Sequence, residues 1–284
     1  MNRRRFLSAA GLTGLAVVGA SSLAVAGAYR FEVTKHQRTL AKLTQPIRVL
    51  QLSDLHFGPY IHADSVKVWV GAALEQHPDL ILITGDILDT ASHQDSVRGR
   101  LKATLSTEVG LLLAEIKQLK APLGVFAVWG NHDYAAPDEM ARFERELEGY
   151  GIHVLTNRGR LVRPDLYVAG VDDLWYGRPD AHAAMAECPE AAASILMCHN
   201  PDYLPGVPAA VDLTLCGHTH GGQLHFPLLG SPWTPSRYGQ RFRAGWSAEP
   251  VSAYVSTGLG VSGIPLRNVP AEMAVFELAP EARA

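Results

Sequence analysis

Five short polar clusters along this chain contain side chains that bind metal ions. Each cluster offers carboxylate, amide or imidazole groups, the oxygen and nitrogen ligands that divalent ions take in proteins. The clusters are Asp54-Leu55-His56, Gly85-Asp86-Ile87-Leu88-Asp89, Gly130-Asn131-His132-Asp133, Cys198-His199-Asn200 and Gly217-His218-Thr219-His220. Together they supply enough ligands to hold two metal ions side by side.

Two of the clusters repeat the same short spacing. One residue separates Asp54 from His56, and one residue separates His218 from His220. In an extended chain, residues i and i+2 point to the same side. Asp54 and His56 can therefore bind one ion, and His218 and His220 present two imidazoles on one side. An isolated Asp-x-His motif would be a weak signal that a simple turn also explains.

Asp86, Asn131 and His199 supply further candidate ligands. Asp86 follows Gly85, which lets the backbone turn tightly, and its two oxygens can bridge two ions about 3.5–4 Å apart. An isolated Asn-His pair after a strand indicates a turn, and a single histidine at a strand end is usually structural. Within a set of five clusters, we interpret Asn131 and His199 as ligands.

Apolar, β-rich runs directly precede most of these clusters. The runs are Ile47–Leu52, Leu80–Ile83, Val125–Val128, Ile195–Met197 and Val211–Leu215. In open α/β sheets, the loops at the carboxyl ends of the strands line one crevice. The sequence therefore predicts that ligands far apart along the chain converge there.

The remaining pattern indicates strands alternating with helices. Helices are predicted at Asp64–His77, Ser106–Leu119 and Pro137–Leu147, the first two ended by prolines. Later strands are predicted at Val154-Leu155, Tyr167–Ala169, before His199 and His218, at Tyr254-Val255 and at Ala274–Phe276. We expect the later strands to form a second, more antiparallel sheet, so that two packed sheets are flanked by helices.

The order of the clusters resembles the calcineurin-like metallophosphoesterases, with every element present between residues 54 and 220. Details are similar to the exported YkuE/YaeI-like branch of phosphodiesterases. These are Asp54-Leu55-His56-Phe57-Gly58, Cys198-His199-Asn200-Pro201-Asp202 and Gly217-His218-Thr219-His220-Gly221-Gly222-Gln223. The resemblance implies an α/β fold that is a four-layer α-β-β-α sandwich of two mixed sheets.

The same resemblance implies a role for each residue. One metal would be held by Asp54, His56, Asp86 and His220, and the other by Asp86, Asn131, His199 and His218. His132 would be the catalytic residue near the leaving group, oriented by Asp89. From the residues alone, either Asp89 or Asp133 could hold His132. The mixed nitrogen and oxygen ligands suit Mn²⁺, Fe or Zn²⁺ better than Mg²⁺.

The amino-terminal residues resemble an export signal. Arg3, Arg4 and Arg5 precede Phe6-Leu7 and an apolar stretch rich in Gly and Ala, the layout of a twin-arginine signal. We expect residues 1–28 to be this signal, with a retained membrane anchor as the alternative. The twin-arginine export machinery would be a partner, and the folded part would lie outside the cytoplasm, in the periplasm or cell envelope. Residues 29–45 are predicted to be a linker and 46–280 the catalytic domain.

Composition restricts the class of protein. The chain has 284 residues, 47% of them apolar, and a net charge of −3 that becomes more acidic once the signal is removed. Such a body is long enough for one domain and argues against nucleic-acid binding. Three cysteines, Cys188, Cys198 and Cys216, suggest no structural disulfide. We expect a monomer.

Function is predicted as hydrolysis of phosphodiester or pyrophosphate bonds, with a glycolipid, envelope polymer or nucleotide as substrate. The resemblance extends to enzymes that cleave UDP-2,3-diacylglucosamine in lipid A synthesis. Arg237 and Arg241, in the segment Pro227–Trp246, could bind a phosphate or headgroup, unless this segment is only a surface loop. A phosphomonoesterase and a non-catalytic, metal-dependent envelope-binding protein are the alternatives.

Overall fold

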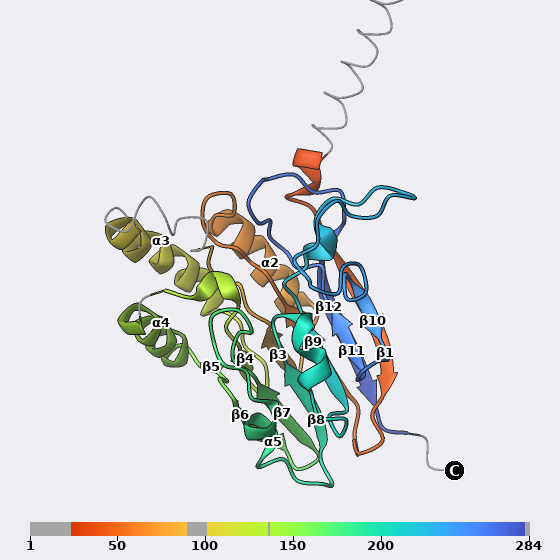
Figure 1. Cartoon of the computed structure of the whole chain (residues 1–284). Helices are drawn as coiled ribbons and strands as arrows, with labels where there is room; N and C mark the ends of the chain where they lie inside the picture. Colours follow the sequence, from red (N-terminus) through yellow and green to blue (C-terminus); the bar gives the residue numbers. More distant parts are fainter. Residues whose placement is uncertain (1–23, 90–100, 136, 282–284) are drawn as a thin grey trace, which may run out of the picture.

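Two six-stranded sheets packed face to face form the centre of the molecule, whose computed structural model describes residues 24–89, 101–135 and 137–281 (Figure 1). The first sheet has the order β1 (Phe31–Thr39), β12 (Ala271–Ala279), β2 (Ile47–Leu52), β3 (Leu80–Ile83), β4 (Val125–Ala127) and β5 (Ile152–Val154). The second has the order β10 (Gly245–Ser247), β11 (Ala253–Val255), β9 (Leu213–Cys216), β8 (Ala193–Met197), β7 (Leu166–Gly170) and β6 (Arg158–Arg163). Both sheets mix parallel and antiparallel pairs, which confirms the predicted fold class.

The strand β3 shows why the first sheet is buried on both faces. All four of its residues are buried. Leu80 and Leu82 belong to the core between the two sheets, whereas Ile81 and Ile83 belong to the core beneath the helices. Side chains alternate between the faces of a strand, so a continuous apolar run satisfies both cores.

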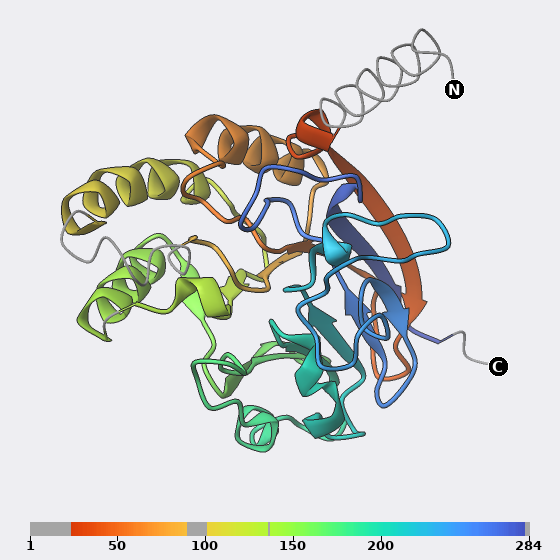
Figure 2. The same ribbon diagram turned by 45° about the horizontal axis from the view of Figure 1, so that its top comes forward.

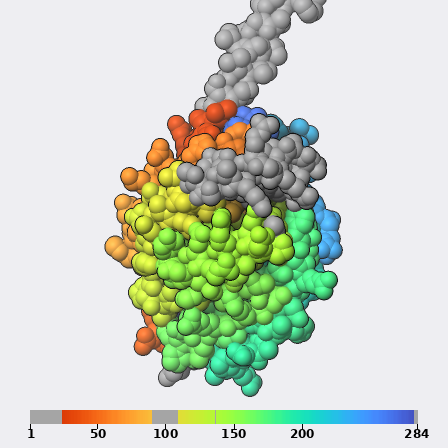
Figure 3. Space-filling model, turned by 90° about the vertical axis from the view of Figure 1, so that its left-hand side faces the viewer, coloured from red at the N-terminus to blue at the C-terminus, as the bar shows by residue number. Residues whose placement is uncertain are grey.

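Three helices cover the outer face of the first sheet (Figure 2). They are α2 (Ala63–Glu75), α3 (Leu101–Ile116) and α4 (Pro137–Gly149), which match the three predicted helices within a few residues. On α2 the buried residues are Val66, Trp69, Val70 and Ala73, the spacing of one helix face. Figure 3 shows this flank of the molecule, with residues of α4 in yellow-green.

A thinner layer covers the outer face of the second sheet. It contains α5 (Ala181–Met185) and the 3₁₀ helix η3 (Pro201–Gly206). The Tyr167 hydroxyl of β7 donates to the Ala184 carbonyl of α5 at 3.1 Å. Cys198 and Cys216 are buried in this core, and all three cysteines are free thiols. Helix, sheet, sheet and helix therefore follow one another as four layers.

One predicted linker contains a strand. The sequence predicts a linker over residues 29–45, whereas Phe31–Thr39 form β1 at the edge of the first sheet. β1 runs parallel to β12, from Phe31 opposite Ala271 to Thr39 opposite Ala279. Its side chains are exposed or only half-buried, because an edge strand has few neighbours. A hydrophobicity pattern therefore gives little sign of it.

The second sheet differs from the prediction in its direction and membership. It is mostly parallel, since β7 with β8, β8 with β9, and β9 with β11 all pair in parallel. The predicted strand at 154–155 overlaps the end of β5, and the predicted strand at 274–276 lies within β12. Both elements belong to the first sheet. Strand direction and sheet membership depend on long-range pairing, which a local pattern does not encode.

The structure adds one observation about the bilayer. Among the helices in the described ranges, none combines the length and apolar character needed to cross a membrane. The predicted signal lies almost entirely in residues 1–23, outside the described residues.

Candidate metal centre

All seven predicted metal ligands lie in loops at one end of the two sheets. Asp54 and His56 follow β2, Asp86 follows β3, Asn131 follows β4, His199 follows β8, and His218 and His220 follow β9. Backbone hydrogen bonds join adjacent loops, for example from the Asp54 amide to the Gly85 carbonyl at 3.0 Å and from the Gly217 amide to the His199 carbonyl at 2.9 Å. The predicted convergence of strand ends is therefore present in the fold.

Backbone strain is concentrated at these ligands. The described residues include nine non-glycine residues with positive φ, and five of them are predicted ligands. They are Asp54 (φ 52°), His56 (φ 48°), Asp86 (φ 51°), His218 (φ 72°) and His220 (φ 51°). Side chains at positive φ are disfavoured by clashes with the backbone, and such residues cluster at functional sites. The strained turns aim these side chains inward.

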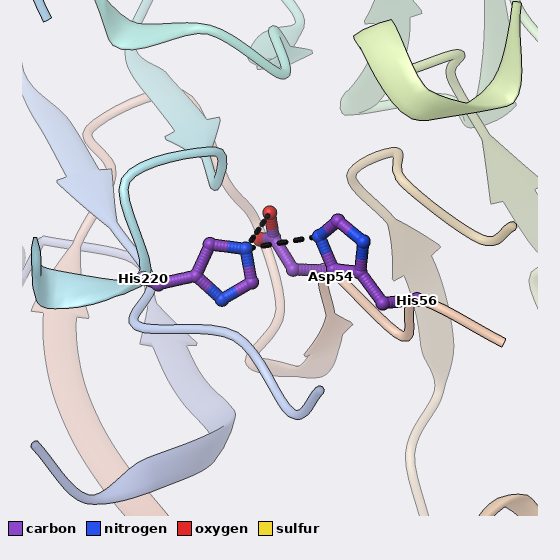
Figure 4. Close-up of side chains that lie close together, drawn as sticks. All are labelled: Asp54, His56 and His220. Carbon is purple, nitrogen blue, oxygen red and sulfur yellow. Dashed lines mark hydrogen bonds and ion pairs between the residues drawn. The ribbon is translucent and has the colours of Figure 1, made fainter. Parts of the chain in front are cut away.

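The first group of ligands contains Asp54, His56 and His220. The three side chains point toward one another from separate loops (Figure 4). The Nε2 atoms of His56 and His220 are 2.9 Å apart, and His220 Nε2 is 3.5 Å from Asp54 Oδ1. All three residues are buried.

The second group contains Asp86, His199 and His218. His199 Nε2 lies 3.2 Å from Asp86 Oδ2, 3.3 Å from His218 Nδ1 and 3.3 Å from Asn131 Oδ1. Its other ring nitrogen, Nδ1, donates to the Thr84 carbonyl at 2.7 Å. That hydrogen bond fixes the tautomer and leaves the Nε2 lone pair facing the group.

Asp86 joins the two groups. Its Oδ2 atom is 3.2 Å from His199 Nε2 in the second group and 3.4 Å from His56 Nε2 in the first. Its Oδ1 atom accepts a hydrogen bond from the His132 amide at 2.8 Å. One carboxylate therefore faces both sets of imidazoles.

The donor set fits divalent metal ions. Two pairs of imidazole nitrogens, His56 with His220 and His199 with His218, face each other at 2.9 and 3.3 Å. Burial lowers the pKa of His56 to about 4 and that of His218 to about 3. These two rings are therefore neutral at neutral pH and carry lone pairs. A cation among these nitrogens and carboxylates gives the lone pairs that face one another a shared partner.

Asp54 also responds to this environment. Burial raises the pKa of its carboxyl to about 6, against the opposing effect of His199 and with the help of the Asp86 charge. A bound cation reverses this effect, because it favours the ionised carboxylate. Ser53 Oγ donates to Asp54 Oδ2 at 2.6 Å, and the His218 amide donates to Oδ1 at 2.9 Å, so the carboxylate is held in place.

His132 lies beside the ligands and is more accessible than they are. Its Nδ1 atom is 2.8 Å from Asp89 Oδ1. The His132 side chain is 17% exposed, whereas those of His56 and His199 are fully buried. Burial disfavours the charged ring, but the hydrogen bond to Asp89 and the charge of Asp86 outweigh it and raise the pKa of His132. The ring can therefore carry a proton toward solvent or substrate.

Between the two carboxylates that could hold His132, the geometry favours Asp89. Asp133 instead accepts hydrogen bonds from the Leu88 amide through Oδ1 and from the Gly130 amide through Oδ2, each at 2.8 Å. It therefore fastens the loop after β4 to the loop after β3. The Asn131–Asp133 segment is a single 3₁₀ turn.

Two residues near the site were missed at the sequence level. Arg267 is fully buried and donates to the backbone carbonyls of Gly260 at 2.6 Å and Val269 at 2.8 Å, and also to that of Thr257. The Gly260 amide in turn donates to the Asp54 carbonyl at 2.7 Å. An arginine in a long irregular stretch gives no local signal of burial, so only the fold reveals its role.

Trp175 is the second missed residue. Its ring packs edge-on against His218, with 4.5 Å between centroids, while 49% of the residue stays exposed. Trp175 lies outside the five polar clusters, so the ligand motifs give no sign of it. The contact places an aromatic wall at the solvent side of the second ligand group.

The segment 227–246 reaches the centre through its backbone. The Thr219 hydroxyl donates to the Arg243 carbonyl at 2.7 Å, and Arg243 Nη1 donates to the Gly221 carbonyl at 2.6 Å. The Arg237 amide donates to Asp202 Oδ2 at 2.7 Å, and the Arg237 side chain is 60% exposed. The Arg241 guanidinium lies 4.9 Å from the Phe242 ring centroid. The substrate-binding role of Arg237 and Arg241 stays a prediction.

Comparison with known families agrees with the fold and the centre. The model of the Calcineurin-like phosphoesterase family matches residues 47–222, more than half of the chain. The chain therefore belongs to the calcineurin-like metallophosphoesterases, as its motifs predict. It is a metal-dependent hydrolase of phosphoric esters.

Individual relatives extend the similarity over nearly the whole chain. Metallophosphoesterase YkuE of Bacillus subtilis is 30% identical over 98% of this chain and 98% of its own length. Phosphodiesterase YaeI of Escherichia coli is 32% identical over 98% of this chain and 99% of its own length. A metallophosphoesterase of Aquifex aeolicus is 30% identical over 84% of this chain and 88% of its own.

Proposed function

We propose that the chain is a phosphodiesterase with a dinuclear metal centre, acting on phosphodiester or pyrophosphate bonds. The position of Asp86 supports two metals. Its Oδ2 atom lies within 3.4 Å of an imidazole nitrogen from each ligand group. In this proposal Asp54, His56, Asp86 and His220 hold one ion. Asp86, Asn131, His199 and His218 hold the other, with Mn²⁺, Fe or Zn²⁺ suited to the mixed ligands.

When bound, such ions neutralise the phosphate oxygens and lower the pKa of water. The remaining chemistry belongs to the chain. His132, the accessible imidazole beside the ligands, donates a proton to the leaving oxygen as the oxygen of water bonds to phosphorus and the ester phosphorus–oxygen bond breaks. Asp89 holds Nδ1 of His132 at 2.8 Å, which leaves Nε2 as the atom that carries this proton. Trp175 shields the second ligand group from solvent on one side.

The test separates proton donation from metal binding. We expect His132→Ala to keep its metal and to lower kcat by about 10²–10⁴-fold, the usual contribution of a general acid. We expect Asp86→Ala to lose metal as well as activity. Metal content by elemental analysis and turnover of bis-p-nitrophenyl phosphate with Mn²⁺ are measured on the same samples.

His153→Ala is the matched control, because His153 is a half-buried histidine on β5 outside both ligand groups. It should keep both metal and turnover. Full turnover in His132→Ala would contradict the role of His132, and full metal content in Asp86→Ala would contradict the bridging role. Complete inactivity of the unsubstituted, metal-loaded protein would favour the envelope-binding alternative.

The substrate class can be tested by comparing the kinds of ester that the protein hydrolyses. We propose a glycolipid or cell-envelope substrate similar to UDP-2,3-diacylglucosamine, supported by the resemblance of the motifs. A substrate screen that compares diesters, pyrophosphates and p-nitrophenyl phosphate distinguishes this from a phosphomonoesterase. Faster hydrolysis of the monoester would overturn the proposal.

We also propose that the protein is exported by the twin-arginine machinery and acts as a monomer in the periplasm or cell envelope. Arg4-Arg5 before Phe6-Leu7 and the uncharged stretch that follows support this proposal. That route carries folded proteins, which suits a chain whose metal ligands come together only on folding.

A further inference from the structure

An exposed apolar loop stands beside the metal centre. The loop, residues 224–233, reads Leu-His-Phe-Pro-Leu-Leu-Gly-Ser-Pro-Trp and contains no Asp, Glu, Lys or Arg. Leu228 is fully exposed, Leu229 is 85% exposed and Trp233 is 68% exposed. Solvent-exposed leucines at the tip of an uncharged loop are costly in water and mark an interaction surface.

The loop is held in this shape by its own backbone and by its base. The Phe226 and Gly230 amides each donate to the carbonyl of the other at 2.9 Å, which forms a closed hairpin. Its base is fixed by Asn268, which exchanges two hydrogen bonds with the backbone of His225, at 2.7 and 2.9 Å. Leu228 has a φ of 70°, a conformation that a bulky side chain rarely adopts. The strained turn presents the leucines outward.

The loop lies where the apolar amino-terminal stretch enters the fold. The Arg267 amide donates to the carbonyl of Ala24, the first described residue, at 2.9 Å. Ala24, Leu224 and Phe226 line one hollow on the surface. In Figures 1 and 2 the start of the described chain and the loop lie at the same end of the molecule. Residues 24–29, the described part of a stretch that has no charged side chain from residue 6 to residue 29 of the sequence, lie at this end, and Arg30 and Glu32 line the same hollow.

The same loop borders the metal centre. Trp233, Leu224 and Ile264 line a cavity of about 190 Å³ together with the ligand His220. Ile264 is also 48% exposed. The base of the loop therefore lines a cavity that a residue of the first ligand group also lines.

We propose that the loop 224–233 docks on a lipid bilayer, with Leu228 and Leu229 inserted among the lipids and Trp233 at the headgroup level. Leucine and tryptophan are the residues that interfacial segments place at these depths. A bilayer is the occupant that the adjoining uncharged stretch of residues 6–29 favours, because that stretch would bring the same end of the molecule to the membrane.

The test measures contact with lipid directly. The full-length chain carries one environment-sensitive fluorophore, at Leu229→Cys or at the control site Leu161→Cys. Leu161 is 47% exposed on β6, which lies well away from the loop in Figure 1. Both variants also carry Cys188→Ser, because Cys188 is the partly accessible thiol and Cys198 and Cys216 are buried. The proteins are reconstituted in vesicles of phosphatidylethanolamine and phosphatidylglycerol containing a nitroxide-labelled lipid.

The label at residue 229 should be quenched at least about twofold more than the label at residue 161, as expected for a group within the headgroup boundary. Adding Leu228→Asp should remove this difference. Equal quenching at the two sites would overturn the proposal. A spectral shift at residue 229 that grows with protein concentration without lipid would identify a second copy of the chain as the occupant and would also overturn it. The readout uses no turnover, so failure of the proposed phosphodiesterase activity would leave its outcome unchanged.

Discussion

At the scale of single residues, Asp165 connects the stretch before β2 to the second sheet. Its Oδ2 atom accepts hydrogen bonds from the Thr44 amide and hydroxyl, both at 2.6 Å, and its Oδ1 atom accepts one from Arg163 Nε at 2.5 Å. Burial by itself would raise the pKa of this carboxyl. The hydrogen bonds from Arg163 and Thr44 outweigh it and lower the pKa from 3.8 to about 2. The ionised carboxylate is therefore favoured by folding.

The pH dependence of stability follows from this shift. A pKa that is lower in the folded chain contributes stability that is present above the ordinary value of 3.8 and is lost as the pH falls toward about 2. We expect Asp165→Asn to melt at a lower temperature than the unsubstituted protein at neutral pH. The gap in melting temperature should shrink below pH 3.8. A difference in melting temperature that stays constant down to pH 2 would contradict the lowered pKa of Asp165.

The residue scale also shows how His132, the proposed catalytic group, differs from the candidate ligands. His132 and the ligand histidines all follow strands, and their residue type does not distinguish them. What distinguishes them is the 17% exposure of His132 and its contact with Asp89. Because of that difference, His132→Ala should lose turnover and keep its metal.

At the scale of elements, the loops that carry the ligands are packed so closely that glycine is required between them. A Cβ atom on Gly217, in the loop after β9, would lie 2.0 Å from Ser53 Oγ and 2.3 Å from Asp54 Oδ2 in the loop after β2. Both contacts are far shorter than van der Waals contact. The side chains that would have to move are Asp54 and the hydroxyl that holds it.

We expect Gly217→Ala to displace Asp54, and so to lower metal content and reduce turnover by at least about 10²-fold, as a misplaced site does. The matched control is Gly71→Ala on α2, where an added Cβ meets nothing within 4 Å. That change should stabilise the helix by about 0.5–1 kcal/mol and leave turnover unchanged. Melting temperature, metal content and turnover are compared for both variants. Normal metal binding in Gly217→Ala would show that the loops can separate without harm.

At the scale of the whole molecule, the metal centre joins the two sheets at one end. Asp54 and Asp86 come from the first sheet, while His199, His218 and His220 come from the second. Elsewhere the sheets are held by a shared apolar core, to which Phe126 and Phe276 contribute from the first sheet and Leu215 from the second. Removal of bound metal would therefore remove a cross-link between the two sheets.

Chelation should lower the melting temperature. A ligand at 100 times its Kd stabilises the folded state by about 2.7 kcal/mol, which corresponds to a shift of roughly 5 °C or more in a domain of this size. Calorimetry before and after dialysis against a chelator measures the shift. Mn²⁺ should restore the original melting temperature better than Mg²⁺, because the imidazole ligands do not suit Mg²⁺. An unchanged melting temperature would mean that the centre is empty or contributes nothing to stability.

Much of the architecture could be predicted because its signals are local. The run Leu80–Ile83 and the helix at 63–75 have the periods of a buried strand and of a helix with one apolar face. The direction of the second sheet could not be predicted, because parallel and antiparallel partners place the same apolar residues on the same faces. The edge strand β1 escaped prediction for another reason, since half-exposed side chains leave no hydrophobic pattern.

The sequence by itself determined the chemistry of this protein. The identity and order of the carboxylates, amide and imidazoles from Asp54 to His220 define the candidate metal ligands, because these side chains supply the donors that divalent ions take. The tertiary structure decided which groups meet. It assigned His132 to Asp89 and not Asp133, buried Arg267 beneath the loop that supports Asp54, and set the apolar loop 224–233 beside the entry of the amino-terminal stretch. These contacts join residues far apart along the chain, and only the packing of the two sheets brings them within bonding distance.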